Sequence, residues 1–298
     1  MRVTMNSMYD QINSDLSRLV ERQADINNQI SSGKIYRKPS DAPVKLTHAL
    51  GVRSSISETD QYGRNIVFAR GWVKATETIL RQVEDRLIRA KELAIQGAND
   101  TLNGDDRRAI AKEVRTIMEE IVALGNTRQG GRYIMAGSRT TGFEAGEYPF
   151  EMDRDLNVTY NGNRDDIKVG TAPGLQQKIN IDGQTGLVES GTFKALKDLY
   201  DSLMNNSQPD IEASMVHIDR AAEEISIQTA LTGAMQNTLD TKETIAEELT
   251  FTNRERLADI EETDIIEAAN ALRAAETGYQ AALASASKVM KMSLADFL

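Results

Sequence analysis

Apolar residues recur at steps of three and four through residues 264–298, with only Glu276 interrupting the series. This spacing puts them on one face of a helix, and such a face needs a partner. A matching pattern runs from Ile12 to Ile30 at the other end of the chain, so we expect the two chain ends to pair as a coiled coil. The positions expected to form a self-assembly or partner interface are Ile12, Leu16, Leu19, Ile26, Ile30, Leu272, Tyr279, Leu283, Met290, Leu294 and Phe297.

Two other interpretations of these terminal helices stay open at this point. A soluble protein can close its own core with a terminal helix pair, without any partner. A helix that lies on a membrane surface is a third interpretation, but it calls for Lys and Arg on the polar face. Residues 261–298 hold six acidic residues against three basic ones, which disfavours the membrane.

The first helix is predicted over residues 5–32, with Gly33 placed to end it. Pro39 and Pro43 then interrupt helical hydrogen bonding, and Ser40 or Asp41 can cap the next helix. The pattern is weak after Leu46 and becomes regular from Ile66 to Ala94, which predicts a long helix. By itself, the stretch with the two prolines could be an ordinary loop between two helices.

Two further helices are expected to pack on this long helix. The polar turn at 96–104 and a helix from Asp105 or Asp106 to about Leu124 predict an antiparallel hairpin. Its third partner is expected from Pro209 to about Ile260, where a proline suits a helix start. Pairing this helix with the hairpin would bring the chain ends together.

A glycine-rich segment, residues 130–191, differs from the rest. Alternating residues at 156–160, 167–169 and 178–181 predict short strands separated by Gly-containing turns. A helix near 193–204 is expected to lead back to the bundle. The predicted fold is therefore mainly α: a long antiparallel helical bundle or coiled coil formed by both chain ends, with a small inserted β-rich domain.

Composition excludes several classes of function. The 298 residues are 27% charged with a net charge of −10 and contain no long basic cluster, which argues against nucleic acid binding. No run approaches the roughly 20 apolar residues of a membrane span. Polar residues throughout residues 1–20 argue against a cleaved secretory signal. The absence of cysteine removes disulfides and thiolate metal sites, and leaves the compartment open.

Candidate chemistry is sparse. The only histidines, His48 and His217, lie far apart in the sequence, which disfavours a histidine-based triad or zinc site. The acidic string that begins at Asp153 lacks the glycine and the final glutamate of a calcium loop, because Val158 and Arg164 occupy those positions. We therefore expect no catalytic, cofactor-binding or metal-binding residues.

Both chain ends resemble the flagellin superfamily. The N-terminal likeness is the Ile-Ser-Ser-Gly-Lys segment, followed by Pro-Ser-Asp and a second proline, within 29–43. The C-terminal likeness covers 264–268, 279–283 and 294–298. Residues 92–99, and above all Asn126-Thr127-Arg128 with 131–137, resemble junction subunits within that superfamily, although Met135 replaces a usual aromatic residue.

The resemblance implies an extracellular structural subunit of the bacterial flagellum, exported through the flagellar type III channel without a cleaved signal, and not an enzyme. Expected partners are further copies in a ring, a neighbouring hook-associated protein, flagellin, and an export chaperone on the C-terminal helix. The alternatives are flagellin itself and a non-flagellar helical signalling or interaction module. The implied layers are 1–42 with 262–298 (inner tube), 43–134 with 191–261 (helical bundle), and 135–190 (outer β-rich insertion).

Overall fold

The structure is a computed structural model that describes residues 5–36, 38 and 40–295. Its chain forms two compact units, one from residues 1–58 with 249–298 and the other from 59–248. Helices α2 (Pro43–Gly97) and α5 (Gln208–Glu261) contribute to both units. The predicted fold class is confirmed: long helices dominate, and the short strands are confined to one inserted segment. The three-layer division of the sequence stays a prediction.

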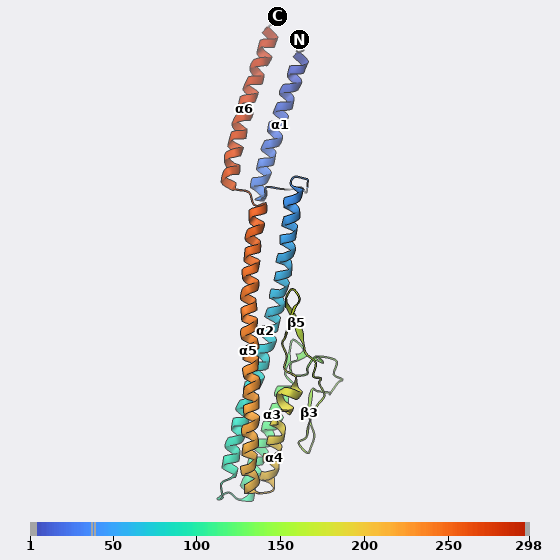
Figure 1. Ribbon diagram of the computed structural model, residues 1–298, viewed down its shortest axis with the longest axis vertical. Coiled ribbons are helices and arrows are strands. Elements are labelled where there is room, and N and C mark those ends of the chain that lie inside the picture. The colour runs from blue at the N-terminus through green and yellow to red at the C-terminus, as the bar shows by residue number, and fades with distance from the viewer. Residues whose placement is uncertain (1–4, 37, 39, 296–298) are drawn as a thin grey trace. The chain divides into compact units, whose positions relative to one another are not determined.

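The 59–248 unit is a helical bundle with one continuous core. Helices α3 (Gly104–Gly125) and α4 (Thr192–Met204) lie beside α2 and α5 (Figure 1), and all four contribute buried apolar side chains. Helix α3 begins at a capping box, in which Asn103 accepts hydrogen bonds from the amides of Asp105 and Asp106 while the Asp106 carboxylate accepts from the amide of Asn103. This satisfies amide groups that a helix start otherwise leaves unpaired, and it agrees with the predicted restart of the helix.

A buried arginine holds the loops at one end of this bundle. Arg107, on α3, donates to the carbonyl oxygens of Gly97 (2.8 Å) and Asn99 (3.1 Å) in the α2–α3 loop. It also donates to the side-chain oxygen of Asn206 (2.5 Å) in the α4–α5 loop. The guanidinium therefore satisfies acceptors from two loops that are distant in the sequence.

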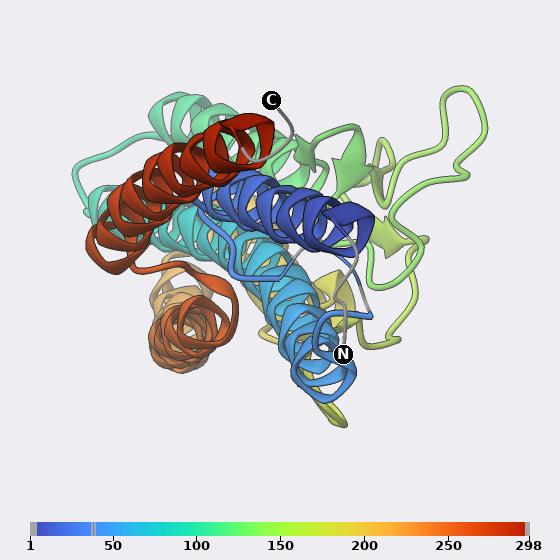
Figure 2. The same ribbon diagram turned by 90° about the horizontal axis from the view of Figure 1, so that it is seen from above.

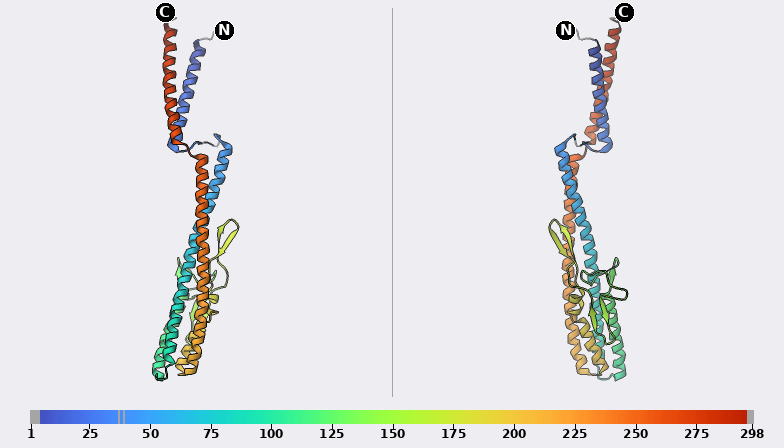
Figure 3. Two further views of the ribbon diagram at one scale, coloured as in Figure 1. Left: turned by 60° about the vertical axis from the view of Figure 1, so that its left-hand side comes forward. Right: turned by 90° about the vertical axis from the view of Figure 1, so that its right-hand side faces the viewer.

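The inserted segment contains three two-stranded antiparallel pairs, and Figure 3 shows it alongside the helices of this unit. The strands are β1 (Arg128–Gln129), β2 (Arg132–Tyr133), β3 (Phe150–Met152), β4 (Val158–Tyr160), β5 (Lys168–Ala172) and β6 (Leu175–Lys178). A five-residue π-helical turn, Gln184–Val188, follows. The β5–β6 hairpin is attached to the bundle by Asn65, which donates to the carbonyl of Gly170, and by Lys242, which donates to Thr171 and Gln177.

The strand expected at 178–181 is wrong in its extent. Strand β6 ends at Lys178, and the next residues are buried without pairing to another strand. The side chain of Asn180 makes hydrogen bonds that a neighbouring strand would otherwise make: it accepts from the amide of Ile167 and donates to the carbonyl of Asp165. The alternation in the sequence therefore marks burial of Ile179 and Ile181 rather than a strand.

The sequence pattern predicts the long helix only from Ile66, but α2 begins earlier and is continuous from Pro43 to Gly97. The inward positions here include Ala49 and Val52, which are buried, and Thr59 and Gly63, which are half-buried. Small and polar residues at such positions weaken the apolar periodicity without breaking the helix. The other predicted helices agree closely with the structure.

The other unit contains α1 (Met5–Ser32), α6 (Ile265–Ala295) and the adjoining ends of α2 and α5. Helices α1 and α6 lie side by side and antiparallel, as Figures 1 and 2 show from two directions. The expected pairing of the chain ends is present within this single chain. The connector between α1 and α2 and the shorter connector between α5 and α6 meet at one end of this pair.

Candidate functional site

The seam between α1 and α6 is built from one isoleucine set against small residues. Ile26 is buried with Ala268 and Ala275, and Ile30, Ala271 and Leu272 pack around them. Tyr279 is half-buried further along α6, and Ile12, Leu16 and Leu19 are half-buried on α1. The structure therefore brings Ile26, Ile30 and Leu272 together, as the heptad pattern predicts.

The register of α6 differs from the predicted positions at Leu283. Its neighbour Ala282 is half-buried, whereas Leu283 is 42% exposed. The positions at the seam are Ala268, Leu272, Ala275, Tyr279, Ala282 and Ala286. Of the remaining predicted positions, the side chains of Met290 and Leu294, and all of Phe297, lie outside the described residues.

The buried alanines are the seam residues that the sequence analysis missed. Ala268, Ala275 and Ala282 are each seven residues apart, so they fall at one heptad position. A search for large apolar residues passes over them, although a strict seven-residue repeat of alanine was the available signal. Small side chains let helices approach closely, so each alanine makes room for a larger residue opposite, such as Ile26.

The two connectors are joined by a short backbone ladder at the base of this pair. Lys34 and Glu262 form an antiparallel bridge. The amide of Ile35 donates to the carbonyl of Glu261 (2.8 Å), and the amide of Thr263 donates to the carbonyl of Gly33 (2.9 Å). Gly33 has φ +68°, a conformation that glycine adopts at little cost. We call this arrangement, residues 33–35 with 261–263, the connector clasp.

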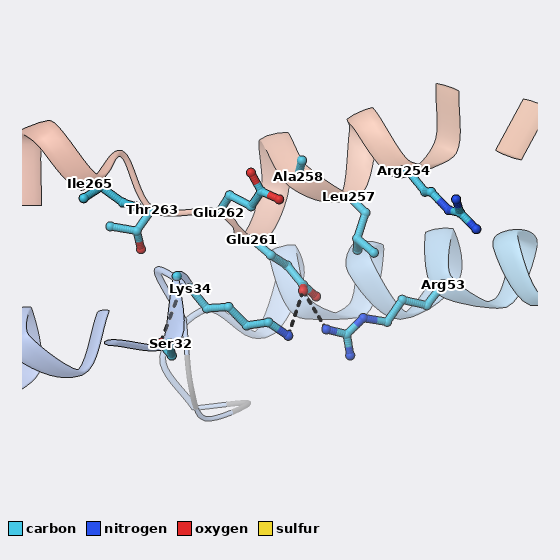
Figure 4. A pocket seen from close by; sticks show the side chains of 11 residues that line it. Ser32, Lys34, Arg53, Arg254, Leu257, Ala258, Glu261, Glu262, Thr263 and Ile265 are labelled. Atoms are coloured by element: carbon cyan, nitrogen blue, oxygen red, sulfur yellow. Dashed lines mark hydrogen bonds and ion pairs between the residues drawn. The ribbon is translucent and has the colours of Figure 1, made fainter. Parts of the chain in front are cut away.

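A buried carboxylate supports the clasp from α5. Figure 4 shows the side chain of Glu261 directed toward Lys34 and Arg53, which lie 3.4 and 2.6 Å from its Oε2 atom. The residue is only 6% exposed, and its Oε1 atom has no hydrogen-bond partner in the structure. A hollow of about 610 Å³ lies beside it, lined in part by Leu257 and Ile265. Because both cations are about half exposed, the carboxylate carries the greater desolvation cost.

We expect Glu261→Gln to loosen the clasp without unfolding the helices. The amide keeps the shape of the side chain but loses both ion pairs, while Lys34 and Arg53 can remain hydrated, so the cost should be about 1–2 kcal/mol. Hydrogen exchange at the amides of Ile35 and Thr263 should speed up. The matched control is Glu262→Gln, because Glu262 is exposed; equal exchange rates in the two variants would contradict this role of Glu261.

The Asn126–Gly137 segment has a structural role in the other unit. The side chain of Asn126 donates to the carbonyl of Phe150 (2.8 Å) and accepts from its amide (2.9 Å), as a neighbouring strand would. The buried Met135 accepts a hydrogen bond from the amide of Gly183 (2.7 Å). A Cβ at Gly137, where φ is +65°, would lie 2.0 Å from the carbonyl oxygen of Asn163. This motif therefore anchors the inserted segment to α3.

None of these arrangements has the parts of a reaction centre. Among the described residues, no group of three or more His, Cys, Asp or Glu side chains is placed to hold a metal ion. His217 contacts the carboxylate of Asp198 (3.0 Å), and both side chains are on the surface. Within the same part of the chain, no helix combines the length and apolarity of a membrane span.

Comparison with known proteins agrees with this organisation. Residues 3–140 match the family described as the bacterial flagellin N-terminal helical region. Flagellar hook-associated protein 3 of Escherichia coli (strain K12) is 26% identical over 257 residues, which is 85% of this chain and 74% of that protein. The chain is therefore similar to bacterial flagellar proteins.

Two further comparisons show similarity to hook-associated protein 3 and FlgL. The protein of that name from Salmonella typhimurium (strain LT2) is 31% identical over 141 residues, which is 47% of this chain and 44% of that protein. The crystal structure of Bacillus cereus FlgL is 25% identical, with a TM-score of 0.59 over 70% of this chain and 99% of that one. Sequence and fold therefore both show similarity to hook-associated protein 3 and FlgL.

Proposed function

We propose that this chain is a structural subunit of the bacterial flagellum that joins a hook-associated protein to the flagellin filament. The observation that carries the proposal is the paired arrangement of α1 and α6 in a chain similar to hook-associated protein 3 over most of its length. A structural role also agrees with a site built from a helix seam and a connector clasp. The subunit would act outside the cell, in the flagellum.

The assembly surface that we propose is the outer side of the terminal helix pair. Val20 on α1, and Ile266 and Leu283 on α6, are exposed, although they belong to helices whose inner side is already satisfied by the seam. Exposed apolar side chains of this kind would gain stability from burial against a neighbouring subunit. The half-buried seam positions would order the pair, and these outer positions would meet other subunits.

Leu283→Asp is expected to block incorporation into flagella while leaving the purified monomer folded. The side chain is 42% exposed in this chain, so a carboxylate there stays hydrated in the monomer. Burial of the unpaired charge in an assembly costs several kcal/mol. Immunoblots of sheared flagella and circular dichroism of the monomer measure the two effects. Arg273→Asp, on the exposed polar face of α6, is the matched control, and equal incorporation of both variants would contradict the proposed surface.

Flagellin is the second candidate, because the terminal signatures belong to the whole superfamily. The Asn126–Gly137 segment and the modest insertion favour the junction subunit. A flagellin must bind itself without limit, whereas a junction subunit has two unlike axial faces and stops at a ring. The similarity to flagellar proteins gives no support to a non-flagellar signalling module.

Deleting the gene distinguishes the two candidates. If the chain is a junction subunit, hooks should remain in place while flagellin is exported and lost to the medium, because filament growth has no seed. Electron microscopy of the cells and immunoblotting of the culture supernatant would test this outcome. Long filaments grown from the purified chain alone would instead favour flagellin.

Several finer features belong to the same proposal. The chain would leave the cell through the flagellar type III channel without a cleaved signal, and an export chaperone would bind the C-terminal helix. Its partners in the flagellum would be further copies of itself in a ring, the neighbouring hook-associated protein and flagellin. The proposal involves no cofactor, nucleic acid or membrane.

A further inference from the structure

Helix α5 is apolar on two opposite faces. One face is buried in the core through Ile225, Thr232 and Leu239. Residues two positions apart lie about 200° apart around a helix. Ile227 and Thr241, each two residues after a buried residue, therefore lie on the face opposite the core. Its large side chains, Ile227, Leu231 and Ile245, are 46–50% exposed. We call the following set the outer face of α5: Ile227, Leu231, Ala234, Thr238, Thr241 and Ile245.

The outer face of α5 is less polar than its composition suggests. The hydroxyl groups of Thr238 and Thr241 donate to the carbonyls of Ala234 and Asn237 on the same helix (2.9 Å each), which satisfies their donor groups within the helix. Residues 225–239 contain no charged side chain, although 27% of the whole chain is charged. This face can therefore lose water at little electrostatic cost.

A second apolar patch lies on α2. Val67 and Phe68 are 59% and 48% exposed, and Gly71 follows one turn later on the same surface. The nearest atom to a Cβ built on Gly71 is the side-chain nitrogen of Gln129, at 3.4 Å, so the β1–β2 hairpin borders the patch. We call Val67, Phe68 and Gly71 the outer face of α2.

Both outer faces point away from the buried core of the same chain. Phe68 is two residues from the buried Ile66, and Ile227 is two residues from the buried Ile225, so each lies about 200° around its own helix from a core position. Two faces that are both turned away from the core of one copy cannot pack on each other within that copy.

Their surroundings are complementary in charge. Arg64 and Lys74, both exposed, flank the outer face of α2, while the exposed Glu248 follows Ile245 about one turn later on α5. The ion pairs of Arg70 with α5 place residues near 67 on α2 at about the level of residues near 244 on α5. Two chains that each carry a net charge of −10 repel one another, so a contact that is uncharged at its centre with basic and acidic edges suits a second copy.

We propose that the outer face of α5 in one copy packs against the outer face of α2 in the next copy. Because the two faces differ, the contact is head-to-tail and leaves an open face on each end copy. Only a few side chains take part, so the contact buries less surface than the roughly 800 Å² per partner of a stable interface. The purified chain is therefore a monomer when dilute, and the contact forms where copies are concentrated. The inference rests on the proposed function only in that flagellar assembly concentrates the copies.

Cysteine cross-linking tests the contact, because the natural chain has no cysteine. Val67→Cys is combined in turn with Leu231→Cys, Thr238→Cys or Ile245→Cys, which sample the outer face of α5 about every 10 Å. The purified double variants are treated at high protein concentration with a short bifunctional thiol reagent. We expect at least one pair to give a ladder of dimers, trimers and longer species. Val67→Cys with Thr116→Cys, an exposed site on α3, should give none.

Ile227→Glu, also on the outer face of α5, added to the pair that cross-links best, should reduce the ladder about tenfold or more, because each 1.4 kcal/mol corresponds to a tenfold change. Ile95→Glu, at an exposed isoleucine of α2 outside both faces, should leave the ladder unchanged. The absence of a ladder from all three pairs would overturn the inference. Dimers from a single cysteine on α5 would overturn it too, because they would show α5 packing on α5.

The same double variants in flagellated cells separate this inference from the proposed function. A ladder in sheared flagella would show the contact in the assembly and support both. A ladder from the purified chain, with no chain in the flagella, would support the inference and count against the proposed function. Chain present in flagella without any ladder there would overturn the contact as an assembly interface.

Discussion

Ile26→Asp should separate α1 from α6 and abolish incorporation into flagella. The residue is 8% exposed and packs between Ala268 and Ala275, and neither alanine can pair with a carboxylate. Burial of an unpaired charge costs several kcal/mol, whereas helices of this length are marginal when isolated. We therefore expect rapid hydrogen exchange along both helices and no protein in sheared flagella. The thermal transition of the 59–248 unit should remain, because that unit has its own core.

Val20→Asp is the matched control for this prediction. It introduces the same carboxylate on the same helix, at a position that is exposed. The terminal pair of the monomer should keep its protection from exchange in this variant. Equal loss of protection in the two variants would show that α1 responds to added charge as such, and the seam around Ile26 would then not be what holds the pair.

Arg107→Ala should lower the free energy of unfolding of the 59–248 unit by about 3 kcal/mol, because it removes three hydrogen bonds of a buried guanidinium and leaves the carbonyl of the buried Gly97 unpaired. The arginine is 6% exposed, and its three hydrogen bonds reach Gly97, Asn99 and Asn206. Urea denaturation followed by circular dichroism measures the change. Arg107→Lys should recover only part of it, since an ammonium group cannot reproduce the planar fork of a guanidinium.

Arg108→Ala provides the comparison at the neighbouring position. Arg108 is exposed and pairs with Asp105 on its own helix, and surface pairs of this kind contribute about 0–1 kcal/mol. A loss of stability in Arg108→Ala as large as that in Arg107→Ala would mean that helix α3, rather than the loops, is sensitive to substitution here.

The sequence predicts the long helices well because their apolar periodicity is sustained over many turns. It fails between Leu46 and Ile66, where Thr59 and Gly63 occupy inward positions of a continuous helix. It also fails at residues 179–181, because the side chain of Asn180, rather than a strand, satisfies the neighbouring backbone. In both places the local pattern is correct about burial, while contacts from distant segments decide the backbone conformation.

The candidate site is predicted in part for a similar reason. The terminal seam follows from heptads, so Ile26, Ile30 and Leu272 are found, although the alanine positions beside them carry too little apolar signal. The connector clasp could not be predicted, because Glu261, Lys34 and Arg53 come from three segments that local patterns do not relate. Whether the outer residues of the pair meet other subunits stays a prediction.

The connector clasp also makes the inserted segment free to change. Lys34 and Glu262 are far apart in the sequence, and joining such distant points would ordinarily cost more chain entropy as the intervening segment grew. Here the packing of α2 with α5 already brings these two points of the chain close together. The clasp therefore adds little further loss of chain entropy. Residues added to or removed from the segment between β3 and β6 therefore leave the closure of the clasp unchanged.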